Sequence, residues 1–195
     1  MKRKIFVVLL LISIATGKTM AQSFDHSHNI YAGGGISATQ LLFRVVENII
    51  PDTANLTTNT TAAYQLTYDY ALLDWLSVGG GFSTQSFELQ FDQYGAFNHT
   101  ATLRRTNLGA RLLLHFHRDA FDFYSGIRIG FSSWSVNSDI ENDAFSALNS
   151  FDTFLFSGQL IPLGIRGYLT ENIGVSFETG VGAPHFLNFG LNYRL

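Results

Sequence analysis

The dominant pattern along most of the chain is a strict alternation of apolar residues with small or polar ones. Over residues 173–182, isoleucine, valine, phenylalanine and threonine alternate with glycine, serine and glutamate, and residues 187–195 repeat the pattern. Successive side chains of a β-strand point to opposite faces of a sheet. A period of two with one apolar face therefore predicts β-strands that are apolar on one side only.

Short polar joints divide this alternation into eight predicted strands. The predicted strands are residues 28–37, 61–71, 76–87, 100–116, 121–135, 154–168, 173–182 and 186–195. Short connections alternate with long ones, and the long ones are 38–60, 88–99 and 136–153. Short periplasmic turns, longer outer loops and an even number of strands are typical of outer-membrane barrels. We therefore expect an all-β fold, an eight-stranded antiparallel up-and-down transmembrane β-barrel with periplasmic termini.

A secreted β-sandwich is the alternative fold, because its strands also alternate. Two features favour the barrel. The polar faces are rich in glycine, serine and asparagine and carry few charges. The apolar faces end in aromatic residues, as expected for the aromatic girdles at the membrane interfaces. These strand-end aromatics are Tyr70, Trp75, Phe121, Phe123, Trp134, Tyr168 and Tyr193.

The N-terminal segment has the layout of a secretory signal peptide. Three basic residues at positions 2–4 precede an apolar run from 5 to about 15, and small residues follow near Ala21. A membrane-spanning helix needs about 20 apolar residues, so a membrane anchor is the less favoured alternative. We predict a cleaved signal peptide over 1–21 and an outer-membrane barrel domain over 22–195.

Composition and charge exclude several classes of protein. The 14% aromatic content argues against disorder, and the absence of cysteine excludes a disulfide scaffold. The chain carries 12 basic and 15 acidic residues, but four of the basic residues lie in the predicted signal peptide. The mature chain thus has a formal net charge of −7, and all eight remaining basic residues are arginines. Such an acidic chain is not expected to bind nucleic acid.

Strand parity predicts which polar side chains point into the barrel. The predicted lumenal residues are Asp69, Asn107, Arg111, Arg128, Arg166, Glu178 and Arg194. Eight strands leave only enough interior for side chains, and buried charges must be paired. We expect an ionic network in which Arg111, Arg128 and Arg166 contact Asp69 and Glu178. A solid polar core is favoured over a gated or ion-selective pore.

The first long connection has a helical rather than an extended period. Apolar residues recur there at positions i, i+1, i+4, i+5 and i+8, and Pro51 follows the stripe. These loop residues are Leu41, Leu42, Val45, Val46 and Ile49. We expect a short amphipathic helix at the membrane interface or over the barrel mouth. The alternative is that the first strand continues past Ser37.

Acidic residues alternate in the connection 136–153, where Asp139, Glu141 and Asp143 are spaced by two. Carboxylates at this spacing can hold calcium or bridge to lipopolysaccharide phosphates through divalent ions. The glycine and the distal glutamate of an EF-hand loop are absent from this stretch. A solvated acidic loop that contributes to partner binding is therefore favoured.

Histidines provide the candidate chemistry. His26 with His28 and His115 with His117 each place two imidazoles on one side of an extended chain near the periplasmic end. The four could bind zinc or copper, but rim histidines without a metal are favoured, and no cofactor is expected. No histidine is followed two residues later by serine, so the His-x-Ser pair of a lipid A deacylase is absent. No enzymatic activity and no catalytic residue are expected.

Two stretches carry a resemblance to a known family. Residues 63–83 (AYQLTYDYALLDWLSVGGGFS) and 166–195 (RGYLTENIGVSFETGVGAPHFLNFGLNYRL) resemble small outer-membrane β-barrel proteins of Gram-negative bacteria, of the OmpA/OmpX-like type. The chain is most similar to the porin-like outer membrane β-barrel families common in Bacteroidetes. The resemblance implies outer-membrane localisation, contact with membrane lipid and lipopolysaccharide, and insertion by the barrel-assembly machinery. Where that family usually ends in phenylalanine, this chain ends in Leu195 with Tyr193 two residues before.

The sequence thus predicts an integral outer-membrane barrel with a structural role, or a surface-interaction role through 38–60 and 136–153. Loops on a rigid scaffold are where binding function usually lies, so an extracellular ligand is expected there. A small porin or ligand-binding channel is one alternative function. A lipid A-modifying outer-membrane enzyme is the other.

Overall fold

The computed structural model describes residues 26–49, 56–93, 97–118, 120–138 and 150–195. The predicted signal peptide and the acidic loop residues Asp139, Glu141 and Asp143 lie outside the described residues. The signal peptide and a role for those carboxylates therefore stay predictions.

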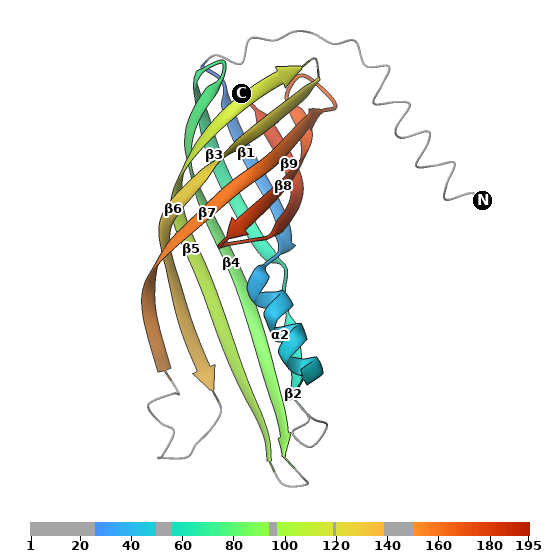
Figure 1. The fold of residues 1–195 in the computed structure, drawn as a ribbon, viewed down its shortest axis with the longest axis vertical. Coiled ribbons are helices and arrows are strands. Elements are labelled where there is room, and N and C mark those ends of the chain that lie inside the picture. Colours follow the sequence, from blue (N-terminus) through green and yellow to red (C-terminus); the bar gives the residue numbers. More distant parts are fainter. Residues whose placement is uncertain (1–25, 50–55, 94–96, 119, 139–149) are drawn as a thin grey trace, which may run out of the picture.

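Eight long strands close into a barrel (Figure 1). The strands are β1 His28–Ile36, β3 Ala63–Leu73, β4 Leu76–Gln93, β5 Phe97–Arg118, β6 Phe121–Ser138, β7 Ser150–Tyr168, β8 Ile173–Gly182 and β9 Leu187–Arg194. Each pairs antiparallel with its neighbours in the sequence of long strands, and β1 pairs with β9 to close the wall. The predicted eight-stranded up-and-down barrel is confirmed.

The wall of the barrel is uneven in height. Strands β4 to β7 contain 18 to 22 residues, whereas β1, β8 and β9 contain 8 to 10. The helix α2 (Ala38–Ile49) and the short strand β2 (Leu56–Thr60) lie beside the tall part of the wall (Figure 1). Strand β2 pairs with the outer part of β4 and prolongs the wall above β3.

The long connection predicted over 88–99 is wrong. Strand β4 continues to Gln93, strand β5 starts at Phe97, and these two residues are register partners. The polar residues Glu88 and Gln90 suggested a loop, but they occupy alternate positions of β4 and share an outward hydrogen bond of 3.0 Å. A hairpin that projects beyond the membrane can expose polar side chains on its outer face and still remain a strand.

The short turns and the C-terminal end lie together at one end of the barrel. The backbone amide of His28 donates to the carbonyl of Leu195 at 3.1 Å, and the amide of Leu195 donates back at 2.9 Å. Because outer-membrane barrels place short turns in the periplasm, this end is assigned to the periplasm and the tall end to the cell exterior. The orientation places α2 on the extracellular side.

Large apolar side chains cover the outside of the barrel rather than its centre. Phe156 is 74% exposed and Leu108 is 67% exposed, on strands whose inward residues are polar and buried. This distribution is the reverse of a soluble protein and matches an outer surface in contact with lipid. The described residues contain no helix that is long and apolar enough to cross a membrane.

Candidate functional site: the barrel lumen and its two ends

The seven residues predicted to be lumenal all lie inside the barrel. Each side chain belongs to the inward-facing set of its strand, and the exposed fractions do not exceed 9%. They are Asp69, Asn107, Arg111, Arg128, Arg166, Glu178 and Arg194. The period-two pattern is enough to place them, because inward and outward positions alternate without interruption along most of each strand.

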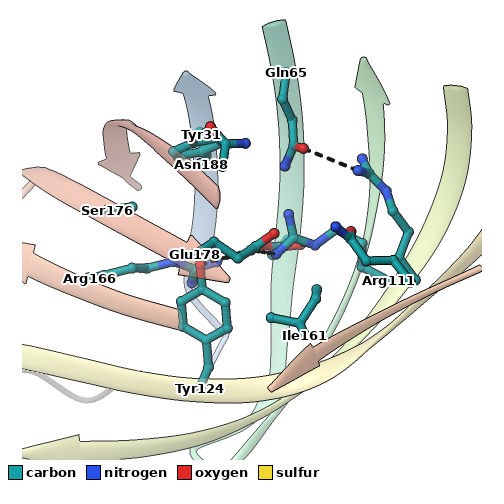
Figure 2. Close-up of polar contacts among 12 residues, drawn as sticks. Tyr31, Gln65, Arg111, Tyr124, Ile161, Arg166, Ser176, Glu178 and Asn188 are labelled. Atoms are coloured by element: carbon teal, nitrogen blue, oxygen red, sulfur yellow. Dashed lines mark hydrogen bonds and ion pairs between the residues drawn. The ribbon is translucent and has the colours of Figure 1, made fainter. Parts of the chain in front are cut away.

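An ionic cluster occupies the periplasmic half of the lumen. Asp69 forms ion pairs with two arginines: its Oδ2 lies 2.6 Å from Nη2 of Arg166, and its Oδ1 lies 3.4 Å from Nε of Arg111. Nη2 of Arg111 also lies 2.7 Å from Oε2 of Glu178. The hydroxyl of Tyr124 also donates to Glu178 at 2.9 Å. Figure 2 shows Glu178 between Arg111 and Tyr124, with Arg166 approaching from the opposite side. Two carboxylates and two guanidiniums therefore neutralise one another away from water.

Arg128 does not join this cluster, and the prediction that it contacts Asp69 or Glu178 is wrong. Its Nη1 donates to the Oε1 of Gln65 at 3.2 Å, the bond drawn at the upper right of Figure 2. In the part of the chain that the structure describes, Arg128 forms no ion pair. Gln65 lies nearer the extracellular end of β3 than Asp69 does, so the side chain of Arg128 extends away from the carboxylates.

The other two predicted lumenal residues make local contacts. Asn107 donates to the hydroxyl of Ser83 at 3.3 Å. Arg194 donates to the backbone carbonyl of Glu171 at 2.9 Å, and its guanidinium lies 4.1 Å from the ring centroid of Tyr168. The first contact joins two register partners of β4 and β5, the second joins β9 to the turn between β7 and β8, and neither extends the central cluster.

The connection between β8 and β9 folds into the lumen, which the sequence did not reveal. His185 is fully buried, and its Nε2 lies 2.9 Å from Oε1 of Glu178. The side-chain amide of Gln159 donates to the backbone carbonyl of His185 at 2.8 Å, and Arg105 donates to the carbonyl of Pro184. The inward position of His185 carries no sequence signal, because a turn has no periodicity.

Arg105 anchors the extracellular half of the lumen. It donates to Gln85 at 3.0 Å and to the hydroxyl of Thr39 in α2 at 2.9 Å. Its guanidinium lies 5.9 Å from the ring centroid of Phe87 and 5.4 Å from that of Trp134. The sequence contained a signal for this residue, since Arg105 has the same strand parity as Asn107 and Arg111.

The predicted helix in the first connection is confirmed as α2. Its N-terminus is capped by the Ser37 hydroxyl, which accepts from the amide of Gln40 at 3.1 Å. The side of α2 that carries Gln40 and Phe43 faces the barrel, where Gln40 bonds Gln85 at 3.4 Å and the Phe43 ring lies 5.3 Å from that of Phe87.

The apolar stripe of α2 faces away from the barrel. Its exposed members are Leu41 at 40%, Leu42 at 64%, Val45 at 52% and Ile49 at 74%. The side chain of Val46 lies outside the described set. The stripe therefore does not close the mouth, because the polar and aromatic side of the helix does so, and four apolar side chains remain available at the cell exterior.

The two histidine pairs lie on different sides of the barrel wall. His26 and His28 form hydrogen bonds to the outward hydroxyls of Tyr70 at 3.0 Å and Tyr68 at 2.6 Å. His115 and His117 instead occupy inward positions of β5 at the periplasmic end. The four imidazoles therefore do not converge on one site.

His115 connects a serine and an aspartate in the order of a serine-hydrolase triad. The Ser77 hydroxyl lies 2.7 Å from Nε2 of His115, whose Nδ1 lies 2.9 Å from Oδ1 of Asp122. Ser77 is 2% exposed and is paired within β4 to strands on both sides. The Ser77 hydroxyl is therefore buried in contact with the His115 ring.

A comparison with protein families identifies the fold's relatives. Residues 6–195 match the family described as outer membrane protein beta-barrel domain. The chain belongs to this family. It is thus a small β-barrel protein of the Gram-negative outer membrane, and the predicted localisation and resemblance are confirmed. A search of curated protein sequences found no match.

Solved structures of small outer-membrane barrels resemble this outer-membrane barrel in fold. Ail, the attachment invasion locus protein of Yersinia pestis, in complex with the heparin analogue sucrose octasulfate, is 10% identical with a TM-score of 0.51. The match covers 88% of this chain and 99% of Ail. OmpW of E. coli is 15% identical with a TM-score of 0.44, over 90% of this chain and 100% of OmpW. These likenesses concern the fold alone.

The lumen of this outer-membrane barrel is filled by its own side chains. Arg111, Arg128 and Glu178 are each 4% exposed, although all three point toward the barrel axis. In a barrel with a water-filled channel, the lumenal side chains would be accessible to water. The exposed fractions therefore indicate a solid polar interior closed from above by α2 and by the connection between β8 and β9.

Proposed function

We propose that this protein is a closed outer-membrane scaffold that presents α2 and the tall hairpins to an extracellular ligand, without transport or catalysis. The observation that carries the proposal is the arrangement of α2. One side of this helix is fixed to the barrel through Thr39, Gln40 and Phe43, while its opposite side exposes an apolar stripe. A fixed helix with a free apolar face is suited to binding.

The filled lumen supports the same proposal. A porin or ligand-binding channel requires a continuous open path, whereas the inward arginines and carboxylates are buried against one another. A lipid A-modifying enzyme requires a nucleophile that an acyl chain can reach, and Ser77 is 2% exposed. Loops on a rigid scaffold are then the natural place for function.

Contact with lipopolysaccharide and insertion by the barrel-assembly machinery are parts of the proposal. The outward apolar residues of the strands supply the lipid contact, and β9 supplies an alternating C-terminal strand of the type that the assembly machinery reads. Both interactions follow from the family architecture and not from a site specific to this chain.

Photo-crosslinking in intact cells tests the binding surface. A photoreactive amino acid replaces Leu42 or Ile49 on α2, and the control position is Phe156, which faces lipid on β7 and is 74% exposed. We expect discrete adducts from the two α2 positions that the control position does not give. If all three positions yield only the same lipid adducts, α2 is a membrane-interface anchor and the proposed surface interaction is wrong.

Bilayer recordings test the closed lumen. The purified protein is expected to give no steady single-channel openings in a planar membrane, because the lumenal side chains leave no continuous path. Steady openings that disappear in the Arg128→Ala variant would show an ion path through the lumen and would overturn the closed-scaffold proposal.

A further inference from the structure

Three potential metal ligands converge at the periplasmic end of the lumen. His115 and His117 are alternate inward residues of β5, and Asp122 is the register partner of His117 on β6. The hairpin between the two strands is short, so both strands begin or end at this point. The fold therefore brings two imidazoles and one carboxylate to the same level without a long loop.

Two of the three distances between the ligand atoms are close to those around a small cation. Oδ1 of Asp122 lies 2.9 Å from Nδ1 of His115 and 3.0 Å from Nδ1 of His117, and the two rings stack with centroids 5.5 Å apart. All three ligand atoms lie within 4.8 Å of one another. Tetrahedral zinc with bonds of about 2.0–2.1 Å separates its ligands by about 3.3 Å. Around such an ion the two distances from Asp122 would lengthen by roughly a few tenths of an ångström, and the two imidazole nitrogens would also have to lie about 3.3 Å apart.

The hydrogen bond on the far side of His117 fixes which ring nitrogen faces Asp122. Nε2 of His117 lies 2.6 Å from the backbone carbonyl of Asp74, and a carbonyl only accepts, so Nε2 donates this bond. Nδ1 is then the ring nitrogen on the side of the cluster, 3.0 Å from Oδ1 of Asp122. His117 can therefore offer Nδ1 to an ion that the carboxylate of Asp122 also binds.

The partners around the cluster are those of a metal site. Metal-bound histidines use the other ring nitrogen to bond a carboxylate, a backbone carbonyl or a water molecule, which fixes the ring. His117 has the Asp74 carbonyl, and His115 has the Ser77 hydroxyl at 2.7 Å. Oδ1 of Asp122 faces both histidines, while its second oxygen, Oδ2, lies 3.5 Å from Arg166 and 3.0 Å from Nδ1 of His115. The contact between the Ser77 hydroxyl and His115 thus orients the His115 ring, which would bind the metal ion.

The accessibility of the three side chains and the type of their ligand atoms indicate which ion the site would bind. The side chain of His117 is 24% exposed, while those of His115 and Asp122 are 2% and 0% exposed, so an ion enters from the periplasm past His117. Calcium and magnesium prefer sites made of oxygen atoms, whereas two imidazoles and one carboxylate suit zinc and its neighbours in the first transition row. Water from the periplasm would complete the coordination.

We propose that His115, His117 and Asp122 form a binding site for a divalent transition-metal ion, with zinc favoured, that joins β5 to β6 at the periplasmic end. This inference is independent of the proposed surface interaction at the opposite end of the barrel. A bound ion would link two strands through their side chains and would thereby stabilise the folded barrel by mass action.

Calorimetric titration of the untagged, refolded barrel with zinc chloride tests the proposal. We expect saturable binding of one ion per chain, weakened roughly tenfold or more in His117→Gln and in Asp122→Asn, as is typical when a metal site loses a ligand or its support. The matched control is the double variant His26→Gln, His28→Gln, which removes the other pair and should bind zinc as the original chain does. The heat-dependent gel shift of each variant verifies that its barrel is folded.

Two results would overturn the metal site. One is the lack of saturable zinc binding by the folded original chain. The other is loss of binding in the His26, His28 double variant with binding retained in His117→Gln. If Asp122→Asn fails to fold, His117→Gln alone decides, because His117 lies at a strand end and is partly exposed.

Discussion

Arg111 and Arg128 are register partners on β5 and β6, yet they are bound in opposite ways. Arg111 extends into the periplasmic half of the lumen and contacts two carboxylates, those of Asp69 and Glu178. Arg128 extends toward the extracellular half and contacts the amide of Gln65. Arg105, farther along β5, also binds neutral groups and lies against aromatic rings. Two buried guanidiniums that start at the same level thus have different charge environments.

The two halves of the lumen therefore stabilise their buried guanidiniums in different ways. Burying a guanidinium removes its hydration, and a carboxylate restores more of the lost free energy than an amide oxygen does. The periplasmic half of the lumen is therefore held together by its charges, each of which depends on the others. In the extracellular half, the arginines depend on neutral acceptors and ring faces, so their contribution to stability is smaller and their replacement is easier.

Removal of a carboxylate that two arginines share should cause the largest loss in the free energy of unfolding. Asp69 binds both Arg166 and Arg111, so Asp69→Asn takes one of two carboxylate partners from each of these buried guanidiniums. We expect a loss of about 3–5 kcal/mol in the free energy of unfolding, the range found when one member of a buried ion pair is removed. Urea unfolding of the barrel in detergent micelles measures the loss.

The matched control for Asp69 lies on the same strand. Gln65→Ala removes the neutral acceptor of Arg128 and should lower the free energy of unfolding by only about 1.5–3 kcal/mol, typical of one hydrogen bond to a charged group. Equal losses for the two variants would contradict the division between the halves. They would mean that carboxylates stabilise this lumen no more than amides do.

A glycine in the periplasmic half provides a second test, in which the expected loss in the free energy of unfolding is intermediate. Gly164 lies beneath the ring of Tyr124, and a Cβ atom there would lie 2.1 Å from two ring carbons. Gly164→Ala must displace the ring from Glu178, and we expect a loss of about 1–3 kcal/mol in the free energy of unfolding, as for other overpacked positions. Thermal unfolding followed by the gel shift compares it with the original chain.

Gly158 on the same strand is the control for Gly164. Among the residues that the structure describes, a Cβ atom at Gly158 would have a single neighbour within 4 Å, a ring carbon of Phe156 at 3.9 Å. Gly158→Ala should therefore change the free energy of unfolding by less than about 0.5 kcal/mol. A loss as large as that of Gly164→Ala would indicate a general requirement for glycine in β7 and not a specific contact between Tyr124 and Glu178.

The division between the halves also separates what the sequence could and could not predict. Strand parity placed Asp69, Arg111, Arg166 and Glu178 correctly, because alternation is a rigid property of extended chain. The same parity places Arg105 and Asp122 inward as well. It could not indicate that Arg128 extends toward Gln65, because the direction of a long side chain along the barrel axis depends on the full set of lumenal neighbours.

Turns and loops limit sequence-based prediction for a different reason. His185 reaches Glu178 from the connection between β8 and β9, where no period indicates inside or outside. The helix α2 was predictable from its apolar stripe, but the side that binds the barrel was not. That side is chosen by Gln40 and Phe43, whose partners Gln85 and Phe87 come from a distant strand. Such contacts exist only once the barrel has closed.

Arg128→Met should change the free energy of unfolding only slightly, and it gives the most direct comparison with Arg111. The substitution removes a buried charge whose desolvation costs several kcal/mol and forfeits one hydrogen bond to Gln65, so the two effects nearly cancel. We expect the free energy of unfolding to change by less than about 1 kcal/mol, in either direction. Arg111→Met is the control, and it should lose about 3–5 kcal/mol because it leaves Asp69 and Glu178 short of a counter-charge. If urea unfolding gives the same large loss for both variants, Arg128 is as essential to the core as Arg111, and the two halves do not differ.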